Sequence, residues 1–184
     1  SASGLASRPI RILLCDEVDR YPASAGTEGD PISLGRKRTT TFWNRKIILT
    51  STPTIKGLSR IEKAYEESDK RVYKVPCPHC MQKQELKWQQ ITWLENKPES
   101  ASLSCKHCAA IIPESKKQWM LQNGEWEAQA ESKRVGFHIS ELYSPFRTWV
   151  ELVEDFLEAK KSPELLQTFV NTTLGETWNM DQGE

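Results

Sequence analysis

Two short apolar runs in this chain each end abruptly at polar residues, and no other feature limits the possible folds as strongly. The first run ends at Cys15 and the second is Ile47-Ile48-Leu49. The polar residues that follow are Asp16-Glu17 after the first run and Thr50-Ser51-Thr52-Pro53 after the second. Short apolar runs that stop at polar groups are typical of central strands in a parallel sheet. We therefore predict buried strands at residues 8–15 and 46–50.

Helical patterns alternate with these strands. Apolar spacing predicts a helix at about residues 58–68, a short helix is expected at 36–42, and Pro and Gly mark 22–35 as a loop. Strand, helix, strand, helix is the α/β pattern. Further along, we expect a return strand at 135–139, an amphipathic helix from Trp149, and a second helix that Ser162-Pro163 begins.

Composition narrows the class of protein. The 184 residues include 25 Lys+Arg and 25 Asp+Glu, so the formal net charge is zero. A neutral chain has no global nucleic-acid footprint, although a local basic patch is not excluded. No apolar stretch approaches the roughly 18 residues of a membrane helix, and the N-terminus lacks a signal-peptide pattern. The length fits one domain, or one domain with a small insert.

The Asp16-Glu17 pair is a candidate nucleotide and metal site. A parallel strand delivers its last side chains to the carboxyl edge of the sheet, where nucleotides bind. There Asp16 can hold Mg²⁺, which prefers hard oxygen ligands, and Glu17 can orient or deprotonate an attacking water. The alternative is a solvated loop start or a helix cap.

Thr50, Ser51 and Thr52 follow the neighbouring strand. Hydroxyl groups at that position can hydrogen-bond a phosphate oxygen or the lytic water, and so can report hydrolysis. The alternative is an ordinary strand-end turn that Pro53 stops. Two polar strand ends with a connection of suitable length between them together favour a nucleotide site.

Four of the five cysteines form two CxxC pairs separated by residues 81–104. Four thiolates in such turns match a tetrahedral Zn²⁺ site, and in a chain without a secretory signal this pattern favours metal over disulfides. The intervening stretch has room for a hairpin between residues 85–88 and 102–104. His79 and His107 are expected to be non-ligands, and Cys15 a buried thiol. A structural role for the zinc is favoured over direct DNA contact. The predicted metal ligands are Cys77, Cys80, Cys105 and Cys108.

Basic residues form three small clusters, at 36–38, 45–46 and 116–117. The first is expected in a loop beside the nucleotide site, where it could touch phosphate or nucleic acid. A solvated surface is the alternative for each cluster. The tryptophans are scattered and are expected to pack small cores rather than stack on bases.

Several of these segments together resemble the large terminase subunit of tailed phages, of the lambda-like GpA type. The resemblance runs nearly end to end and keeps its order, which makes it more specific than any one motif. The matching segments include Leu14-Cys15-Asp16-Glu17-Val18-Asp19, Phe42-Trp43-Asn44-Arg45-Lys46, Ser51-Thr52-Pro53-Thr54, Cys77-Pro78-His79-Cys80, Tyr143-Ser144-Pro145-Phe146 and residues 169–178.

The resemblance implies an ATP-driven motor that moves double-stranded DNA into a capsid in the cytoplasm of the bacterial host. It implies a homo-oligomer that works with a small terminase subunit and the capsid portal, without a membrane. Asp16 would be the Walker B metal aspartate, and Glu17 the catalytic glutamate. Thr50, Ser51 and Thr52 would bind nucleotide and couple hydrolysis to DNA movement.

The expected fold is therefore α/β: part of a P-loop (ASCE-type) ATPase sheet with an inserted zinc ribbon and C-terminal helices. The expected domains are 1–71 for the ATPase core, 72–112 for the ribbon, and 113–184 for the return strand and helices. No G-x-x-x-x-G-K-[ST] phosphate loop occurs in the 184 residues. We expect that loop upstream, the nuclease beyond residue 184, and an inactive isolated chain. The alternative function is a zinc-ribbon nucleic-acid-binding module on a non-catalytic α/β scaffold.

Overall fold

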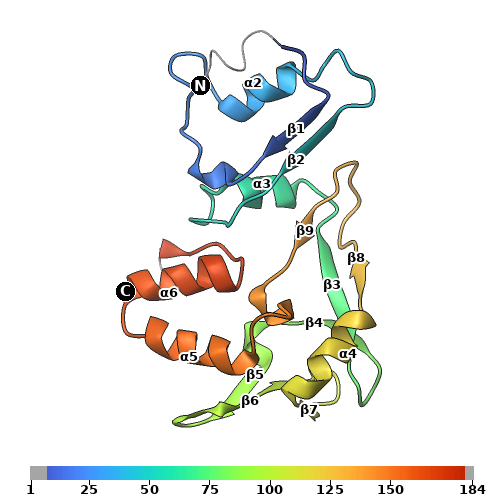
Figure 1. Ribbon diagram of the computed structural model, residues 1–184, viewed down its shortest axis with the longest axis vertical. Coiled ribbons are helices and arrows are strands. Elements are labelled where there is room, and N and C mark those ends of the chain that lie inside the picture. Colours follow the sequence, from blue (N-terminus) through green and yellow to red (C-terminus); the bar gives the residue numbers. More distant parts are fainter. Residues whose placement is uncertain (1–7, 181–184) are drawn as a thin grey trace.

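Two parallel strands form the centre of the N-terminal part of the molecule (Figure 1). The computed structural model describes residues 8–180. Strand β1 (Ile12–Cys15) pairs with β2 (Lys46–Leu49) in parallel, in a register that runs from Ile12 opposite Lys46 to Cys15 opposite Leu49. Both predicted strands are thus confirmed, although β1 is half as long as predicted and β2 is one residue shorter.

Only one face of this sheet is covered by the described residues. Leu13 and Cys15 are buried against Val18 and Ile32, whereas Leu14 on the opposite face is 68% exposed. Ile12 and Ile48 share this exposed face. The prediction of strands buried on both faces is therefore wrong for the described structure, because α2 and α3 both pack on the same side.

The two helices of this part are short and have side-chain caps. Helix α2 (Pro31–Lys37) begins where Asp30 accepts a hydrogen bond from the Ser33 N–H at 2.8 Å. Asp30 and Pro31 favour a helix start at this point. The helix therefore begins about one turn earlier than the predicted helix at 36–42, and it occupies the end of the predicted loop at 22–35. Helix α3 (Arg60–Glu66), capped by Ser59, confirms the predicted helix at 58–68. Between β1 and α2, residues Val18–Arg20 form the 3₁₀ turn η1.

The second part of the molecule is built from two small sheets. The first has the order β4-β3-β8, and β9 also pairs with β3; the second has the order β5-β6-β7. The predicted hairpin is wrong in one strand, since β6 pairs with residues 91–94 and not with 85–88. The bounds are β3 (Arg71–Pro76), β4 (Lys83–Glu85), β5 (Ile91–Leu94), β6 (Lys97–Ser104), β7 (Ile111–Ile112), β8 (Glu125–Glu127) and β9 (Phe137–His138).

Strand β9 is the predicted return strand, but it does not return to the β1–β2 sheet. It pairs in parallel with β3, with Arg71 opposite Phe137 and Val72 opposite His138. A two-residue strand gives little pairing energy, so its position depends on side-chain packing.

The domain limits at 71/72 and 112/113 remain predictions.

The remaining elements are short helices and turns. Helix α5 starts at Trp149 and α6 follows the Ser162 cap, as predicted. The longest described helix has 11 residues, and none of those in residues 8–180 is long and apolar enough to cross a membrane. The bounds are η2 (Trp88–Gln90), η3 (Glu114–Lys116), α4 (Lys117–Gln122), η4 (Glu141–Tyr143), α5 (Trp149–Ala159), α6 (Pro163–Thr168) and the π-helical turn η5 (Phe169–Thr173).

Trp149 lies at the centre of a core that joins α5 to the small sheets. Its side chain is fully buried and its indole N–H donates to the Leu142 carbonyl at 3.1 Å. The same core contains Val75 of β3 and Leu103 of β6. Residues from 72–112 and from α5 therefore contribute to one core.

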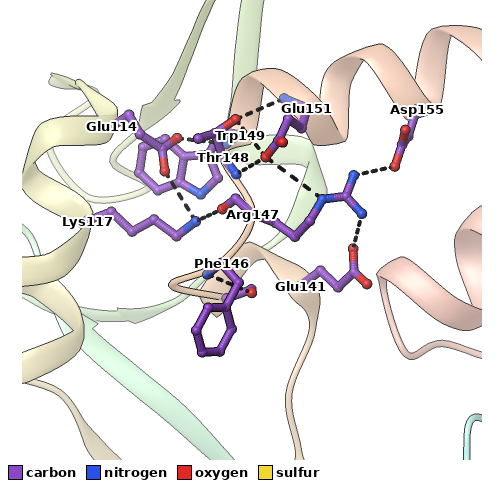
Figure 2. Close-up of polar contacts among 10 residues, drawn as sticks. Glu114, Lys117, Glu141, Phe146, Arg147, Thr148, Trp149, Glu151 and Asp155 are labelled. Carbon is purple, nitrogen blue, oxygen red and sulfur yellow. Dashed lines mark hydrogen bonds and ion pairs between the residues drawn. The ribbon is translucent and has the colours of Figure 1, made fainter.

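A buried lysine fixes the start of α5 to the turn before α4 (Figure 2). Lys117 donates to the Arg147 carbonyl at 2.6 Å and pairs with Glu114 at 3.2 Å. Glu114 also accepts a hydrogen bond from the Trp149 N–H at 2.7 Å. Burial lowers the pKa of Lys117, while the Glu114 carboxylate opposes this shift. The predicted solvated surface at 116–117 is thus wrong for Lys117.

A substitution at Tyr143 would test how much this shared core contributes to stability. Its hydroxyl donates to the Tyr73 carbonyl at 2.6 Å and accepts from the Leu86 N–H at 2.7 Å. Tyr143→Phe removes this partner from the buried Leu86 N–H and from the part-buried Tyr73 carbonyl, so we expect a loss of about 1–3 kcal/mol in the free energy of unfolding, measured with urea. The control is Tyr65→Phe, which removes one contact of 3.4 Å to the Arg71 carbonyl. Equal, small losses in both variants would contradict the assigned role.

Candidate nucleotide site and thiolate cluster

The parallel register brings the two predicted strand ends into direct contact. Asp16 follows β1 and Thr50 follows β2, and the Thr50 hydroxyl donates to Asp16 Oδ1 at 2.6 Å. The Glu17 N–H donates to the same oxygen at 3.0 Å. Both Asp16 and Thr50 are exposed, so this edge is open to solvent. A carboxylate and a hydroxyl are hard oxygen donors of the kind that Mg²⁺ prefers.

Glu17 has an unusual backbone conformation. Its φ of 52° and ψ of 47° lie in the left-handed region, which costs a non-glycine residue about 1 kcal/mol or more. Its carboxylate accepts from Arg20 Nε at 2.9 Å, and the Glu17 and Arg20 side chains are 42% and 73% exposed. An ion pair this exposed contributes little, so the Glu17 carboxylate can exchange partners readily.

Ser51 and Thr52 have different surroundings. Ser51 Oγ accepts from the Asp19 N–H at 3.2 Å and donates to the Thr52 carbonyl at 2.9 Å. Within residues 8–180, the Thr52 hydroxyl has no hydrogen-bond partner. The structure thus brings Thr50 to Asp16 and uses Ser51 to hold the turn after β1.

Asp19 organises the loops around the site. One carboxylate oxygen accepts from the Ile61 N–H at 2.8 Å, and the other accepts from the Thr54 hydroxyl at 2.9 Å. Asp19 therefore joins η1 to the start of α3 and to the segment after β2. Sequence reasoning gave it no structural role. With both oxygens bonded, Asp19 is poorly placed to act on water.

Residues 171–178 contact the segment after β2, and sequence reasoning missed this contact. The Thr54 carbonyl accepts from the Trp178 N–H at 2.8 Å and from Asn171 Nδ2 at 2.9 Å, and the Lys56 N–H donates to the Trp178 carbonyl at 2.9 Å. Asn171 and Trp178 are both buried. The segment after β2 is therefore held between Asp19 and residues 171–178.

The four predicted cysteines come together as one cluster. All four Sγ atoms lie within 4.8 Å of one another, and the Cys77–Cys108 and Cys80–Cys105 distances are 3.9 and 3.8 Å. Tetrahedral zinc with bonds of about 2.3 Å requires a sulfur separation of about 3.8 Å. The residues present therefore fit Zn²⁺, and neither His79 nor His107 belongs to the cluster, as predicted.

Hydrogen-bond donors around Cys105 favour its thiolate form, whereas burial raises the pKa of Cys77. Burial raises the pKa of Cys105, but the Cys108 and His107 N–H groups outweigh it and the pKa falls to about 6. Gln84, which sequence reasoning missed, is fully buried and its Nε2 lies 3.4 Å from Cys105 Sγ. Its side-chain oxygen, Oε1, accepts a hydrogen bond from the Lys106 N–H at 3.0 Å. Gln84, in β4, therefore links the strand that follows the first CxxC pair to the second CxxC pair.

Cys15 is separate from this cluster. Its side chain is 7% exposed, and burial raises the pKa of its thiol. This confirms the predicted buried thiol.

The first basic cluster is not where the sequence placed it. Residues 36–38 form the end of α2 and the turn after it, and the Arg38 carbonyl accepts from the Ile10 N–H just before β1. This is the N-terminal end of the strands, opposite Asp16. The prediction that residues 36–38 lie in a loop beside the nucleotide site is therefore wrong, because α2 runs antiparallel to β1.

Two family matches cover most of the chain. Residues 1–126 match the family described as phage terminase large subunit gpA, ATPase domain. The chain belongs to this family. Residues 134–184 match the terminase large subunit gpA, endonuclease domain. The nuclease-type sequence thus begins within this chain, and not beyond residue 184 as expected.

Curated relatives agree with this assignment. The chain is 38% identical to the terminase large subunit of Enterobacteria phage P21 and 32% identical to that of Escherichia phage lambda. Each comparison covers all of this chain and 33% of the relative, so the chain spans about a third of their length. No solved structure matches.

The two matched regions are not separate in space. Lys117 of the first region bonds to Arg147 of the second, and Trp149 of the second shares one core with Val75 of the first. Strand β3 pairs with β4 from the first region and with β9 from the second. The family boundary therefore crosses one continuous core.

The thiolate cluster makes a direct prediction. The chain purified without chelator should contain one Zn²⁺ per molecule by mass spectrometry of the metal content. Cys77→Ser and Cys105→Ser should each reduce this to less than about half an equivalent, because zinc needs four soft ligands here. Cys15→Ala is the matched control and should keep the full equivalent. Less than half an equivalent in the unmodified chain would disprove the site.

Proposed function

We propose that this chain is part of an ATP-driven motor that packages phage DNA, and that it supplies the metal-binding and catalytic side of the nucleotide site. The observation that carries the proposal is the contact of Asp16 with Thr50 at the carboxyl edge of two parallel strands, within the region that matches the ATPase family. Nucleotides bind at this edge in open α/β sheets.

The proposed roles follow from the chemistry of the side chains. Asp16 would hold Mg²⁺, which neutralises phosphate charge when bound with ATP. Glu17 would orient water and accept its proton, since its carboxylate is exposed and only weakly paired with Arg20. Thr50, Ser51 and Thr52 would bind nucleotide and couple hydrolysis to DNA movement.

Contacts around the segment after β2 support the coupling role. Thr50 bonds to Asp16, Ser51 bonds to the turn that carries Asp19, and Thr54 bonds to Asp19 and to the C-terminal segment. A change at the Thr50 hydroxyl therefore has a short bonded route to residues 171–178. Switch segments in other P-loop enzymes respond to phosphate in a similar way.

The exposed face of the β1–β2 sheet fits a partial P-loop sheet of ASCE type. Ile12, Leu14 and Ile48 form an apolar surface that further strands or helices of a longer protein would cover. The phosphate loop would come from that longer protein, since these 184 residues contain none. Hydrolysis by this chain alone should therefore be negligible.

The zinc site is proposed to be structural, as a ribbon-like element that holds short strands in place. Double-stranded DNA, a small terminase subunit and a capsid portal are the proposed partners, in a homo-oligomer in the host cytoplasm. The alternative of a nucleic-acid-binding ribbon on an inert scaffold is not favoured, because the ATPase match includes both strands of the nucleotide site.

The catalytic role of Glu17 can be tested in a terminase large subunit that contains this chain and a phosphate loop. Glu17→Gln should retain ATP binding and reduce Mg²⁺-dependent hydrolysis about 10²-fold or more, since it removes the general base. Asp16→Asn should instead weaken binding of the Mg²⁺–nucleotide. The charge-matched control is Glu28→Gln at an exposed position in the loop before α2, which should hydrolyse ATP normally. Normal turnover by Glu17→Gln would refute the assignment.

A further inference from the structure

Positive charge is concentrated in one segment of this neutral chain. No acidic residue occurs between Asp30 and Glu62. The same 31 residues contain seven cations: Arg36, Lys37, Arg38, Arg45, Lys46, Lys56 and Arg60. The balancing acidic residues therefore lie elsewhere in the chain.

The fold gathers several of these cations at the N-terminal end of the parallel strands, the upper end of the sheet in Figure 1. The Ile10 N–H donates to the Arg38 carbonyl at 2.8 Å, and the Lys46 N–H donates to the Arg11 carbonyl at 2.9 Å. These bonds bring the residues before β1 beside the loop between α2 and β2. We call this surface the basic end; it comprises Arg8, Arg11, Lys37, Arg38, Arg45 and Lys46.

Charges at the basic end are not neutralised within the molecule. None of its six cations forms an ion pair with any residue in 8–180. Five of the six are exposed, and only Arg38 is half-buried. Some lysines elsewhere in the described residues differ, since Lys70, Lys83 and Lys161 each pair with a glutamate. Unpaired cations on one surface are the electrostatic pattern of a polyanion site.

The loop at the basic end is held by hydrogen bonds and presents an aromatic side chain. Thr39 is buried, its hydroxyl donates to the Arg36 carbonyl at 2.7 Å, and its own carbonyl accepts from the Phe42 N–H at 3.1 Å. Trp43, next in the loop, is 93% exposed. Single-stranded nucleic acid needs a series of aromatic platforms, whereas a basic surface with one aromatic is better suited to a duplex backbone.

We propose that the basic end binds the phosphodiester backbone of duplex DNA, through Arg11, Arg38, Arg45 and Lys46 with Trp43 beside them. This surface is distinct from the nucleotide site, because four strand residues at about 3.3 Å each separate it from Asp16 by roughly 13 Å. This assignment rests on the proposed function in taking duplex DNA as the partner, but it does not depend on the proposed catalytic roles. If the basic end did not bind duplex DNA, the proposed catalytic roles would be unaffected.

The test is binding of a fluorescein-labelled 20-base-pair duplex to the zinc-loaded 184-residue chain, measured by anisotropy across a salt series. The variant is Arg38→Gln/Arg45→Gln/Lys46→Gln, which removes three phosphate contacts. We expect about 10-fold or more weaker binding at low salt, and a plot of log K against log salt that is less steep by about 2–3. The control is Lys70→Gln/Lys83→Gln/Lys161→Gln, which removes the same charge from ion-paired positions and should bind like the unmodified chain.

Several results would overturn the proposal. One is that both triple variants bind the duplex equally more weakly than the unmodified chain. A second is that the unmodified chain does not bind the duplex at about 50 mM salt. A third is that the chain binds a 20-nucleotide single strand more tightly than the duplex, and that Trp43→Ala abolishes this binding. Competition by polyglutamate as effective as that by unlabelled duplex at equal charge would instead indicate an acidic protein partner. Circular dichroism checks the fold of each variant. If the triple variant does not fold, the exposed double variant Arg45→Gln/Lys46→Gln replaces it, with Lys83→Gln/Lys161→Gln as its control.

Discussion

Parallel pairing of β1 with β2 is the constraint on which the candidate nucleotide site depends. Because the strands run in the same direction and in register, the residues that follow them meet at one edge, and Thr50 bonds to Asp16. An antiparallel pairing would place these side chains at opposite ends. The loops beyond the strands then need to be fixed, and Asp19 does this with both carboxylate oxygens. The site therefore depends both on strand direction and on the half-buried carboxylate of Asp19.

The thiolate cluster and the Trp149 core have a comparable role in the second part of the molecule. Strands of two to eight residues bury little surface by themselves, and a bound metal would supply folding energy that such strands lack. Trp149 and Tyr143 then join these strands to helices from the endonuclease-type region. Because residues 171–178 also contact the loop after β2, the endonuclease-type region contacts both parts of the molecule. ATPase-type and endonuclease-type sequence thus form one structural unit here.

Features with a local cause could be predicted from the sequence. The strands ending at Cys15 and Leu49, the helix after Leu58 and the Ser162 cap each follow from residues close to one another in the chain, and the cysteine cluster follows from two local CxxC pairs. Long-range features could not be predicted in this way. The partner of β9 depends on β3, more than 60 residues earlier, and the roles of Asp19, Gln84 and Asn171 depend on acceptors or donors in distant loops. Lys117 appeared solvated because its neighbour Lys116 is also basic, and only packing against Trp149 shows that it is buried.

The central claim is that the Asp16 edge binds the metal and Glu17 faces the attacking water. The most direct test is a crystal structure of a terminase large subunit that contains this chain, with Mg²⁺ and a non-hydrolysable ATP analogue bound. The account predicts that the metal contacts the Asp16 carboxylate directly or through one water, and that the Glu17 carboxylate has left Arg20 to hydrogen-bond a water beside the terminal phosphate. A metal held by other carboxylates, with the Asp16–Thr50 and Glu17–Arg20 pairs intact, would contradict it.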